Sequence, residues 1–443
     1  MDQTFIDSYS CYDSYKDSGV DWLGEIPEEW NLTPAFKFIN ENKLKNKGLT
    51  VDTVLSLSYG NILIKPKEKL TGLVPESFET YQIVEPNDII IRCMDLQNDK
   101  TSLRIGLVKD KGIITSAYLA LKVANSYLPE YLYYYLHSLD TSKAIYKMGT
   151  GLRQNLSFGD FKRFQVPNIP LKVQQSIVDF VKTKSAQIDQ AITLKQQQIT
   201  KLEEYKQIII QNAVTKGLNP DVPMKDSGVD RVSKLPEHWE VKKFRFSFKF
   251  QRGLNITKDN LRDEGVLCLN YGEIHSKYGF ELLPEHTLKY VDEKYIETNS
   301  KSLLDDGDFV FADTSEDTEG SGNFSYVNGQ MHVFAGYHTL IAKPIISFDS
   351  RFIAYLLDSR AFRGQVRQKV KGVKVYSITQ SILKGTYIWL PPREEQKEIV
   401  EKLDSEISLL NQTIQSYKTQ IDRLKEYKTI LINQTVTGKI KVS

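Results

Sequence analysis

Cysteine is scarce in this sequence, which contains only Cys11, Cys93 and Cys268, far apart in the chain. So few cysteines exclude a disulfide scaffold and are typical of a reducing cytoplasm. No run of eighteen apolar residues occurs, so the sequence predicts no membrane span. The first residues, MDQTFIDSYS, are acidic and polar and lack the apolar core of a signal peptide. We therefore expect a cytoplasmic protein.

Net charge is also small, because 58 lysines and arginines oppose 56 aspartates and glutamates and leave +2. Hydrophobic residues make up 40% and charged residues 26% of the chain, which is the composition of an ordinary soluble protein. At about 150 residues per domain, the length suggests roughly three domains. A net charge near zero does not exclude nucleic acid as a partner, but it requires that any anion-binding surface be local.

Recognisable catalytic motifs are absent. The sequence has no GxxxxGK[ST] nucleotide loop and no glycine-rich turn of the dinucleotide-binding type. The run LPPR at 390–393 lacks both the amide or carboxylate and the aromatic residue of the amino-methyltransferase motif. His332 and His338 have zinc-like spacing but no accompanying Cys-x-x-Cys. The acidic run SEDTEG (315–320) lacks a Ca²⁺ pattern and is interpreted as a solvated loop. We therefore expect no catalytic, cofactor-binding or metal-binding residues in this chain.

The chain repeats itself, and the repeat defines its organisation. Residues 16–30 (KDSGVDWLGEIPEEW) match residues 225–239 (KDSGVDRVSKLPEHW), and residues 169–218 align without a gap with residues 391–440. The sequence is therefore an A–B–A′–B′ duplication. Its predicted segments are A at 1–170, B at 171–218, A′ at 219–390 and B′ at 391–443.

The B segments have the pattern of long helices. In B′, two series of apolar residues recur every seven positions: Leu403, Leu410, Tyr417, Leu424 and Leu431, and Val400, Ile407, Ile414 and Ile421. Such heptads indicate a coiled coil. Segment B repeats the pattern, although Ser185 and Lys195 interrupt it. A proline precedes each segment, and Gly217 and Gly438 are the predicted stops of the two helices.

The A segments have the pattern of mixed α/β domains with largely antiparallel sheets. Short β-branched runs, such as DIIIRC (88–93) and GIITSAYLALKV (112–123), predict strands. The runs PEYLYYYLHSL (129–139) and SRFIAYLLDSR (350–360) predict short helices packed on them. If the long helices pair through their shared seam, the order of segments makes them antiparallel and returns the C-terminus near the N-terminus. The predicted fold class is α+β: two similar mixed α/β domains, related by a pseudo-twofold axis and separated by two long helices in an antiparallel coiled coil.

Basic residues gather at the same place in both repeats. Residues 359–393, called the basic strip below, contain eight lysines and arginines and no acidic residue. The matching stretch, 141–178, contains six basic residues and one acid, Asp160. A solvated charged face is the simpler interpretation of such a run. Its recurrence at equivalent positions favours a local surface for phosphate contacts.

Together these motifs resemble the specificity subunit of type I restriction–modification enzymes. The resemblance lies in the KDSGVD repeat, in TGLRQNLSFGDFKRFQVPNIP (150–170) and in LPPREEQKEIV (390–400), and it covers nearly the whole chain. One departure is visible: the first copy has Pro-Leu-Lys-Val-Gln-Gln where the family usually shows Pro-Pro and Glu-Gln.

The resemblance implies that A and A′ are target-recognition domains, each reading half of a bipartite, asymmetric site in double-stranded DNA. It implies that B and B′ are spacer helices that also dock two methyltransferase subunits. S-adenosylmethionine, ATP and Mg²⁺ would then belong to those subunits and to a restriction/translocase subunit, with no cofactor in this chain.

The candidate DNA contacts are basic and amide side chains near loops, because Arg reads guanine, Gln reads adenine and Lys more often holds phosphate. In A they are Arg92, Asn98, Lys100, Arg104, Lys147, Arg153 and Gln154. In A′ they are Arg363, Arg367, Lys369, Lys371, Lys374 and Tyr376. Tyr59 and Tyr271, each followed by glycine, occupy equivalent positions and are interpreted as either core or DNA-facing.

Two other functions stay open. One is a coiled-coil, paired-domain adaptor that binds proteins or glycans, and absent or salt-insensitive DNA binding would favour it. The other is a lone nuclease or methyltransferase, and DNA methylation by this chain alone would indicate that activity.

Overall fold

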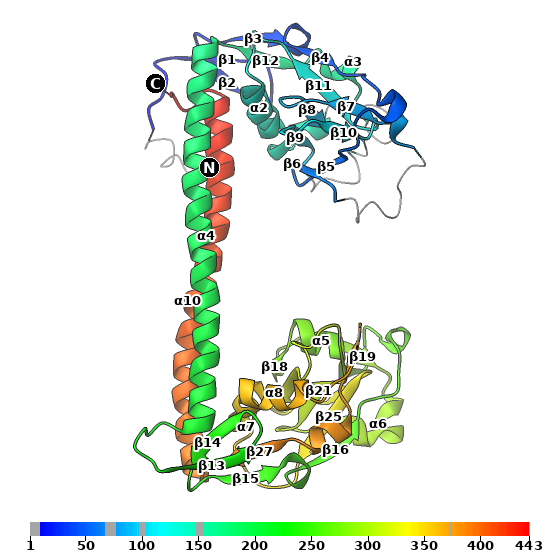
Figure 1. The fold of residues 1–443 in the computed structure, drawn as a ribbon, viewed down its shortest axis with the longest axis vertical. Coiled ribbons are helices and arrows are strands. Elements are labelled where there is room, and N and C mark those ends of the chain that lie inside the picture. Colours follow the sequence, from blue (N-terminus) through cyan, green and yellow to red (C-terminus); the bar gives the residue numbers. More distant parts are fainter. Residues whose placement is uncertain are drawn as a thin grey trace. The chain divides into compact units, whose positions relative to one another are not determined.

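A computed structural model describes residues 9–66, 77–94, 96, 103–147, 155–372 and 374–442. The chain forms two compact units (Figure 1). Unit 1 is Met1–Lys195 together with Lys418–Ser443, and unit 2 is Gln196–Tyr417. Each unit therefore combines one mixed α/β region with a stretch of both long helices. The predicted division into A, B, A′ and B′ stays a prediction. It treats each long helix as a segment of its own, whereas each compact unit contains part of both long helices.

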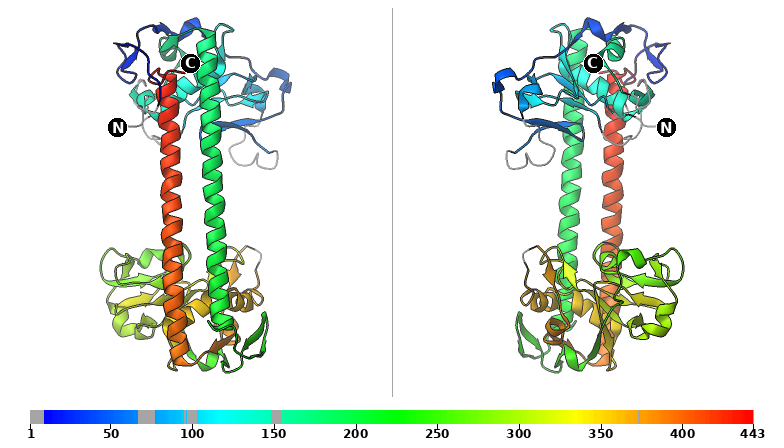
Figure 2. Two further views of the ribbon diagram at one scale, coloured as in Figure 1. Left: turned by 90° about the vertical axis from the view of Figure 1, so that its left-hand side faces the viewer. Right: turned by 90° about the vertical axis from the view of Figure 1, so that its right-hand side faces the viewer.

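The two long helices are α4 (Leu171–Lys216) and α10 (Arg393–Val436), with 46 and 44 residues. Their heptad positions are buried or half-buried, whereas most positions between them are exposed. Within unit 1, Asp189 pairs with Lys428 and Lys195 with Gln420, so the partner's number falls as the residue number rises. This order is that of antiparallel neighbours, and Figure 2 shows α10 beside α4. No helix among the described residues is long and apolar enough to cross a membrane.

The α/β region of unit 1 is built from short strands. Its strands are β1 (Tyr15–Asp17), β2 (Glu25–Pro27), β3 (Asn31–Pro34), β4 (Ile39–Glu41), β5 (Leu55–Ser58), β6 (Asn61–Ile64), β7 (Gln82–Val84), β8 (Ile89–Ile91), β9 (Ile105–Leu107), β10 (Gly112–Ile114), β11 (Leu119–Val123) and β12 (Gln165–Asn168), and its shorter α-helices are α2 (Pro129–Thr141) and α3 (Phe158–Phe161). The central sheet is antiparallel in the order β4-β11-β8-β9, and α2 packs against β9. The run 112–123, predicted as a strand, forms two strands. The chain turns between them, where the N–H of Tyr118 donates a hydrogen bond to the carbonyl of Thr115 at 3.2 Å.

The α/β region of unit 2 has larger sheets. Its strands are β13 (Met224–Val229), β14 (Val232–Pro236), β15 (Glu240–Lys243), β16 (Phe248–Arg252), β17 (Val266–Leu269), β18 (Phe280–Leu282), β19 (Lys289–Val291), β20 (Leu303–Leu304), β21 (Phe309–Ala312), β22 (Thr314–Ser315), β23 (Phe324–Val327), β24 (Val333–Ala335), β25 (Thr339–Pro344), β26 (Tyr376–Ser377) and β27 (Tyr387–Leu390). Its shorter α-helices are α5 (Tyr271–Ser276), α6 (Lys294–Thr298), α7 (Ser350–Asp358), α8 (Arg360–Arg367) and α9 (Gln380–Lys384). The main sheets run β16-β25-β21-β23-β18 and β19-β17-β24-β20, with parallel pairs only at β18–β23 and β17–β24 among the described strands. The largely antiparallel sheet expected from the sequence is observed.

Each long helix is fastened to its α/β region by an equivalent glutamine. Gln174 Oε1 accepts a hydrogen bond from the backbone N–H of Leu128 at 2.8 Å, and its Nε2 donates to a carbonyl five residues earlier at 2.8 Å. Gln396 makes the same two bonds at 2.8 Å, with the N–H of Asp349 as the donor. Both side chains are almost fully buried, where an unpaired amide would be costly. The repeat seen in the sequence therefore extends to its hydrogen bonds.

The far end of each long helix completes the other α/β region. In unit 2, the indole N–H of Trp389 donates to the carbonyl of Val214, near the end of α4. In unit 1, the hydroxyl of Tyr131 donates to the carbonyl of Val436, the last residue of α10, at 3.0 Å, and beyond the helix the N–H of Lys441 donates to the carbonyl of Ser10 at 2.7 Å. The predicted return of the C-terminus towards the N-terminus is therefore confirmed within unit 1.

The two predicted helix stops have the backbone that favours glycine. Gly217 follows α4 with φ of +72°, and Gly438 follows α10 with φ of +78°. A Cβ at Gly438 would lie 2.6 Å from Pro27 and 3.0 Å from Trp30, and a Cβ at Gly217 would lie 3.5 Å from Trp239. Each helix thus ends near a glycine that lies beside the repeated tryptophan and has a left-handed backbone, which residues with a side chain rarely adopt.

Candidate nucleic-acid interface

The basic strip of unit 2 begins with α8. Ser359 caps this helix, and its Oγ accepts a hydrogen bond from the N–H of Phe362 at 3.3 Å. Phe362 and Val366 are fully buried in the core. Because the apolar side of the helix is buried, its arginines must emerge on the remaining faces.

Two of these arginines already have internal partners. Arg363 donates to Asn323 Oδ1 at 2.6 Å and to Asp358 Oδ1 at 2.8 Å. Arg367 lies 2.6 Å from Glu319, which belongs to the acidic run 315–320. Burial lowers the pKa of Arg367, and the Glu319 carboxylate opposes that effect. The acidic run, interpreted as a solvated loop, is therefore held against the basic strip.

The lysines of the strip differ from one another in their availability. Lys369 Nζ donates to the carbonyl of Gly385 at 2.9 Å. Lys371 and Lys374 are exposed and have no side-chain partner within the part of the chain that the structure describes. Tyr376 is half-buried because its strand, β26, pairs with β22. The strip therefore offers two ammonium groups to an external anion.

In unit 1, Arg104 has a structural role. Its side chain is 0% exposed, and its Nη1 donates to the carbonyls of Arg92 at 3.2 Å and Met94 at 2.8 Å. Its guanidinium carbon lies 5.2 Å from the centre of the Tyr146 ring, and its backbone N–H donates to Asp140 at 2.5 Å. The prediction of a DNA contact at Arg104 is therefore corrected: an enclosed guanidinium whose donors are used cannot reach a nucleic acid, and it positions the chain after β8 instead.

The other candidates of unit 1 stay predictions. Arg92 follows β8 and is half-buried. Lys147 ends the 3-10 turn Ala144–Lys147. The remaining candidates lie outside the described residues: Asn98, Lys100, Arg153 and Gln154.

The two equivalent tyrosines differ in burial. Tyr59 is 82% exposed at the turn between β5 and β6, and its φ is +47°. Tyr271 begins α5, is half-buried and lines a pocket. The core position is therefore excluded for Tyr59, whereas Tyr271 packs against a buried cluster and both alternatives stay open for it.

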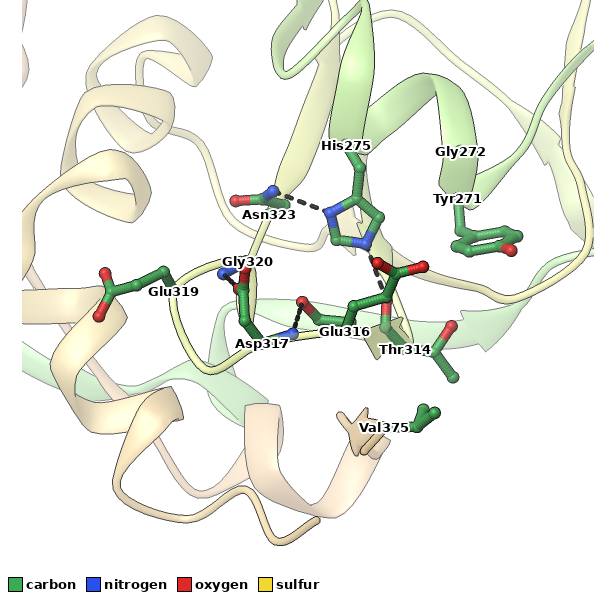
Figure 3. A pocket seen from close by; sticks show the side chains of 11 residues that line it. Tyr271, Gly272, His275, Thr314, Glu316, Asp317, Glu319, Gly320, Asn323 and Val375 are labelled. Atoms are coloured by element: carbon green, nitrogen blue, oxygen red, sulfur yellow. Dashed lines mark hydrogen bonds between the residues drawn. The ribbon is translucent and has the colours of Figure 1, made fainter. Parts of the chain in front are cut away.

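The pocket lies between α5, the acidic run 315–320 and Val375 of the basic strip (Figure 3). His275 of α5 connects its walls: Nε2 lies 2.8 Å from the carbonyl of Thr314, and Nδ1 lies 2.9 Å from Asn323 Nδ2. Since the amide of Asn323 donates to Nδ1, we assign the proton to Nε2, which donates to Thr314. The imidazole therefore fixes the start of the acidic run.

Sequence reasoning missed this pocket. The acidic run 315–320 and the basic strip were both visible, and their opposite charges were a signal that the two segments meet. His275 gave no such signal, because its partners lie about 40 and 50 residues further along the chain.

Several known proteins are similar to this chain in sequence. Residues 236–425 match the family model of the type I restriction modification DNA specificity domain, and they include the basic strip and the pocket. The chain is 25% identical to the type I restriction enzyme MjaVIII specificity subunit of Methanocaldococcus jannaschii, over 94% of each chain. It is 22% identical to the type I restriction enzyme EcoKI specificity subunit of Escherichia coli K12, over 47% of this chain and 45% of that one.

Its fold also has a solved counterpart. A chain from work on complex assembly and conformational transition of the type I R-M system superposes with a TM-score of 0.67 at 14% identity, covering 94% of this chain and 99% of that chain. Sequence motifs, domain match and full-length relatives agree: residues 236–425 match the type I restriction modification DNA specificity domain, and the chain as a whole is similar to type I specificity subunits.

Proposed function

We propose that this chain is the sequence-specific DNA-binding subunit of a type I restriction–modification complex and that it reads a bipartite target. The observation that carries the proposal is the match of residues 236–425 to a DNA specificity domain. Lys371 and Lys374 lie within this domain, and both side chains are exposed. Exposed ammonium groups suit phosphate contacts, which position a protein on a duplex.

The bipartite target follows from the duplication. The equivalent bonds of Gln174 and Gln396 support two related domains. The antiparallel contacts of α4 and α10 within unit 1 support a pseudo-twofold arrangement about an antiparallel coiled coil. Each target-recognition domain then reads one half-site, and the two half-sites are read in opposite senses.

We infer that the two half-sites differ in sequence. At equivalent places, unit 1 has Tyr59 on a hairpin turn, whereas unit 2 has Tyr271 at the start of a helix beside a pocket. Surfaces of unlike shape and charge favour unlike bases. The target should therefore be asymmetric.

The long helices would also dock two methyltransferase subunits. In unit 2, apolar side chains remain 52% exposed at Tyr205, 47% exposed at Ile208 and 66% exposed at Leu409, and such surface favours a protein partner. In this proposal the partners carry S-adenosylmethionine, and a restriction/translocase subunit uses ATP and Mg²⁺. The chain itself contributes no catalysis, and the complex works in the cytoplasm.

Methylome mapping tests the proposal directly. The chain is co-expressed with adenine methyltransferase subunits of type I restriction–modification systems from its source organism, in a host that lacks adenine methylation. We expect methylated adenines in one bipartite, asymmetric sequence, and none when either component is expressed alone. Failure of the purified complex both to methylate and to bind DNA would reject the proposal. Methylation by this chain alone would instead identify a lone methyltransferase.

The two exposed lysines should carry part of the salt dependence. In the double variant Lys371→Ala and Lys374→Ala, the slope of log K against log salt should fall by about 0.9 for each phosphate that is no longer neutralised. Lys369 is left intact because it bonds to Gly385. The matched control is Lys258→Ala with Lys301→Ala, which removes two exposed lysines of the same unit outside the strip. Equal slopes for the two double variants would show that the strip is only solvated.

A further inference from the structure

We propose that Glu316 reads a base: its carboxylate accepts a hydrogen bond from the exocyclic amino group of an adenine or a cytosine in the half-site contacted by unit 2. This inference rests on the proposed function and names the base chemistry that the pocket beside the basic strip would recognise.

The pocket is continuous with the basic strip. Its lining includes Tyr271, Glu316 and Val375, and Figure 3 shows the Val375 side chain across from α5. Val375 lies directly between Lys374, which is exposed, and Tyr376 in sequence. A duplex whose phosphates contact Lys374 therefore passes close to the mouth of the pocket.

The backbone that carries Glu316 is held on both sides. Ser315 pairs with Tyr376 in the β22–β26 ladder. Thr314 accepts a hydrogen bond from His275, which in turn accepts one from Asn323, as the dashed lines in Figure 3 show. Asn323 Oδ1 then accepts from Arg363 at 2.6 Å. A side chain that discriminates between bases needs such a fixed origin.

The acidic side chains of the run are not equivalent. Asp317 Oδ1 accepts a hydrogen bond from the N–H of Gly320 at 2.6 Å. Glu319 pairs with Arg367 at 2.6 Å. Glu316 is exposed and has no hydrogen-bond or ion-pair partner within the described ranges of the chain. It is therefore the carboxylate of the run whose two oxygens both remain available to a ligand.

The charge of Glu316 restricts that ligand. A carboxylate accepts hydrogen bonds and donates none, and it repels phosphates. In the major groove, adenine N6 and cytosine N4 are donors, whereas guanine and thymine present acceptors on their edges. When DNA is bound beside Glu316, its carboxylate therefore makes a favourable contact with a base only where an exocyclic amino group faces it. The pocket should prefer adenine or cytosine over guanine or thymine at one position of one strand.

A double-mutant cycle on the DNA tests the proposal. The complex of this chain with its methyltransferase subunits is bound to its mapped target, and to duplexes in which single amino groups are removed by purine in place of adenine or 2-pyrimidinone in place of cytosine. For one such position, excluding the methylated adenines, the wild type should lose roughly 5- to 150-fold in affinity. The Glu316→Ala variant should lose nothing at that position and should also accept guanine or thymine there.

The control is Glu297→Ala, which removes an exposed carboxylate of α6 in the same unit. It changes the net charge by the same amount as Glu316→Ala, and it should leave the discrimination between bases unchanged at every position of the target. If all amino deletions cost the wild type and Glu316→Ala the same, the base-reading role is overturned while DNA binding stands. If the wild-type complex does not bind DNA at all, the proposed function itself fails.

Discussion

Inserting seven residues into both long helices, after Leu202 in α4 and after Leu424 in α10, is expected to move the two half-sites of the proposed bipartite target apart by roughly 3 base pairs. A heptad adds about 10 Å to a helix at ~1.5 Å per residue, and base pairs are ~3.4 Å apart along each strand. Seven residues preserve the a/d register, so the seam should survive. Mapped methylation should show both half-site sequences unchanged and their separation increased.

The structure explains why these insertion points should be tolerated. Both leucines are half-buried seam residues. Downstream of the first, Val214 packs in the core of unit 2, and downstream of the second, Leu431 packs in a cluster of unit 1. The packed helix ends therefore keep their neighbours. Affinity should still fall, because 3 base pairs rotate one half-site by about 100° relative to the other.

A heptad inserted into α4 alone is the matched control. It shifts one helix against the other and breaks the pairs Asp189–Lys428 and Lys195–Gln420 or their counterparts in unit 2. Methylation should then disappear. An active double insertion that still modifies only the original spacing would show that these helices do not set the distance.

Replacing Arg104 by Met should destabilise unit 1 strongly. The variant keeps most of the side-chain volume but removes two charge-assisted hydrogen bonds to the carbonyls of Arg92 and Met94. We expect a loss of about 3 kcal/mol, and a fall in Tm of roughly 10 °C in a thermal melt of the purified chain. The control Arg163→Met changes an exposed arginine of the same unit and should shift stability by less than about 0.5 kcal/mol.

The stability deficit of Arg104→Met should depend on pH. Burial raises the pKa of Asp140, and the Arg104 charge is among the interactions that lower it. Without that charge, the pKa of Asp140 rises further. A carboxyl whose folded pKa exceeds its unfolded pKa favours folding at low pH, and this contribution is lost as pH rises between the two values. The deficit should therefore be smaller at pH 5 than at pH 8. An unchanged Tm with weaker DNA binding would restore Arg104 as a DNA contact.

The sequence by itself determined the long helices and the internal repeat. Heptad spacing is a local property, so it predicted the buried seam of α4 and α10 and their ends before Gly217 and Gly438. The KDSGVD repeat, the run 150–170 and the start of segment B′ carried the resemblance to type I specificity subunits. The order of the segments also predicted the return of the C-terminus, which the bond between Lys441 and Ser10 confirms. These features follow from periodicity and chain order, which need no knowledge of distant contacts.

Only the tertiary structure decided which basic residues are available to DNA. Arg104 is enclosed, and Arg363 and Arg367 are held by Asp358 and Glu319. In the sequence these arginines look like Lys371 and Lys374, which stay exposed. The difference arises because hydrogen bonding and charge compensation depend on groups brought together by folding, 48 residues apart for Arg367 and Glu319. A charge pattern along the chain therefore predicts where a basic surface forms, but not which of its side chains remain unpaired.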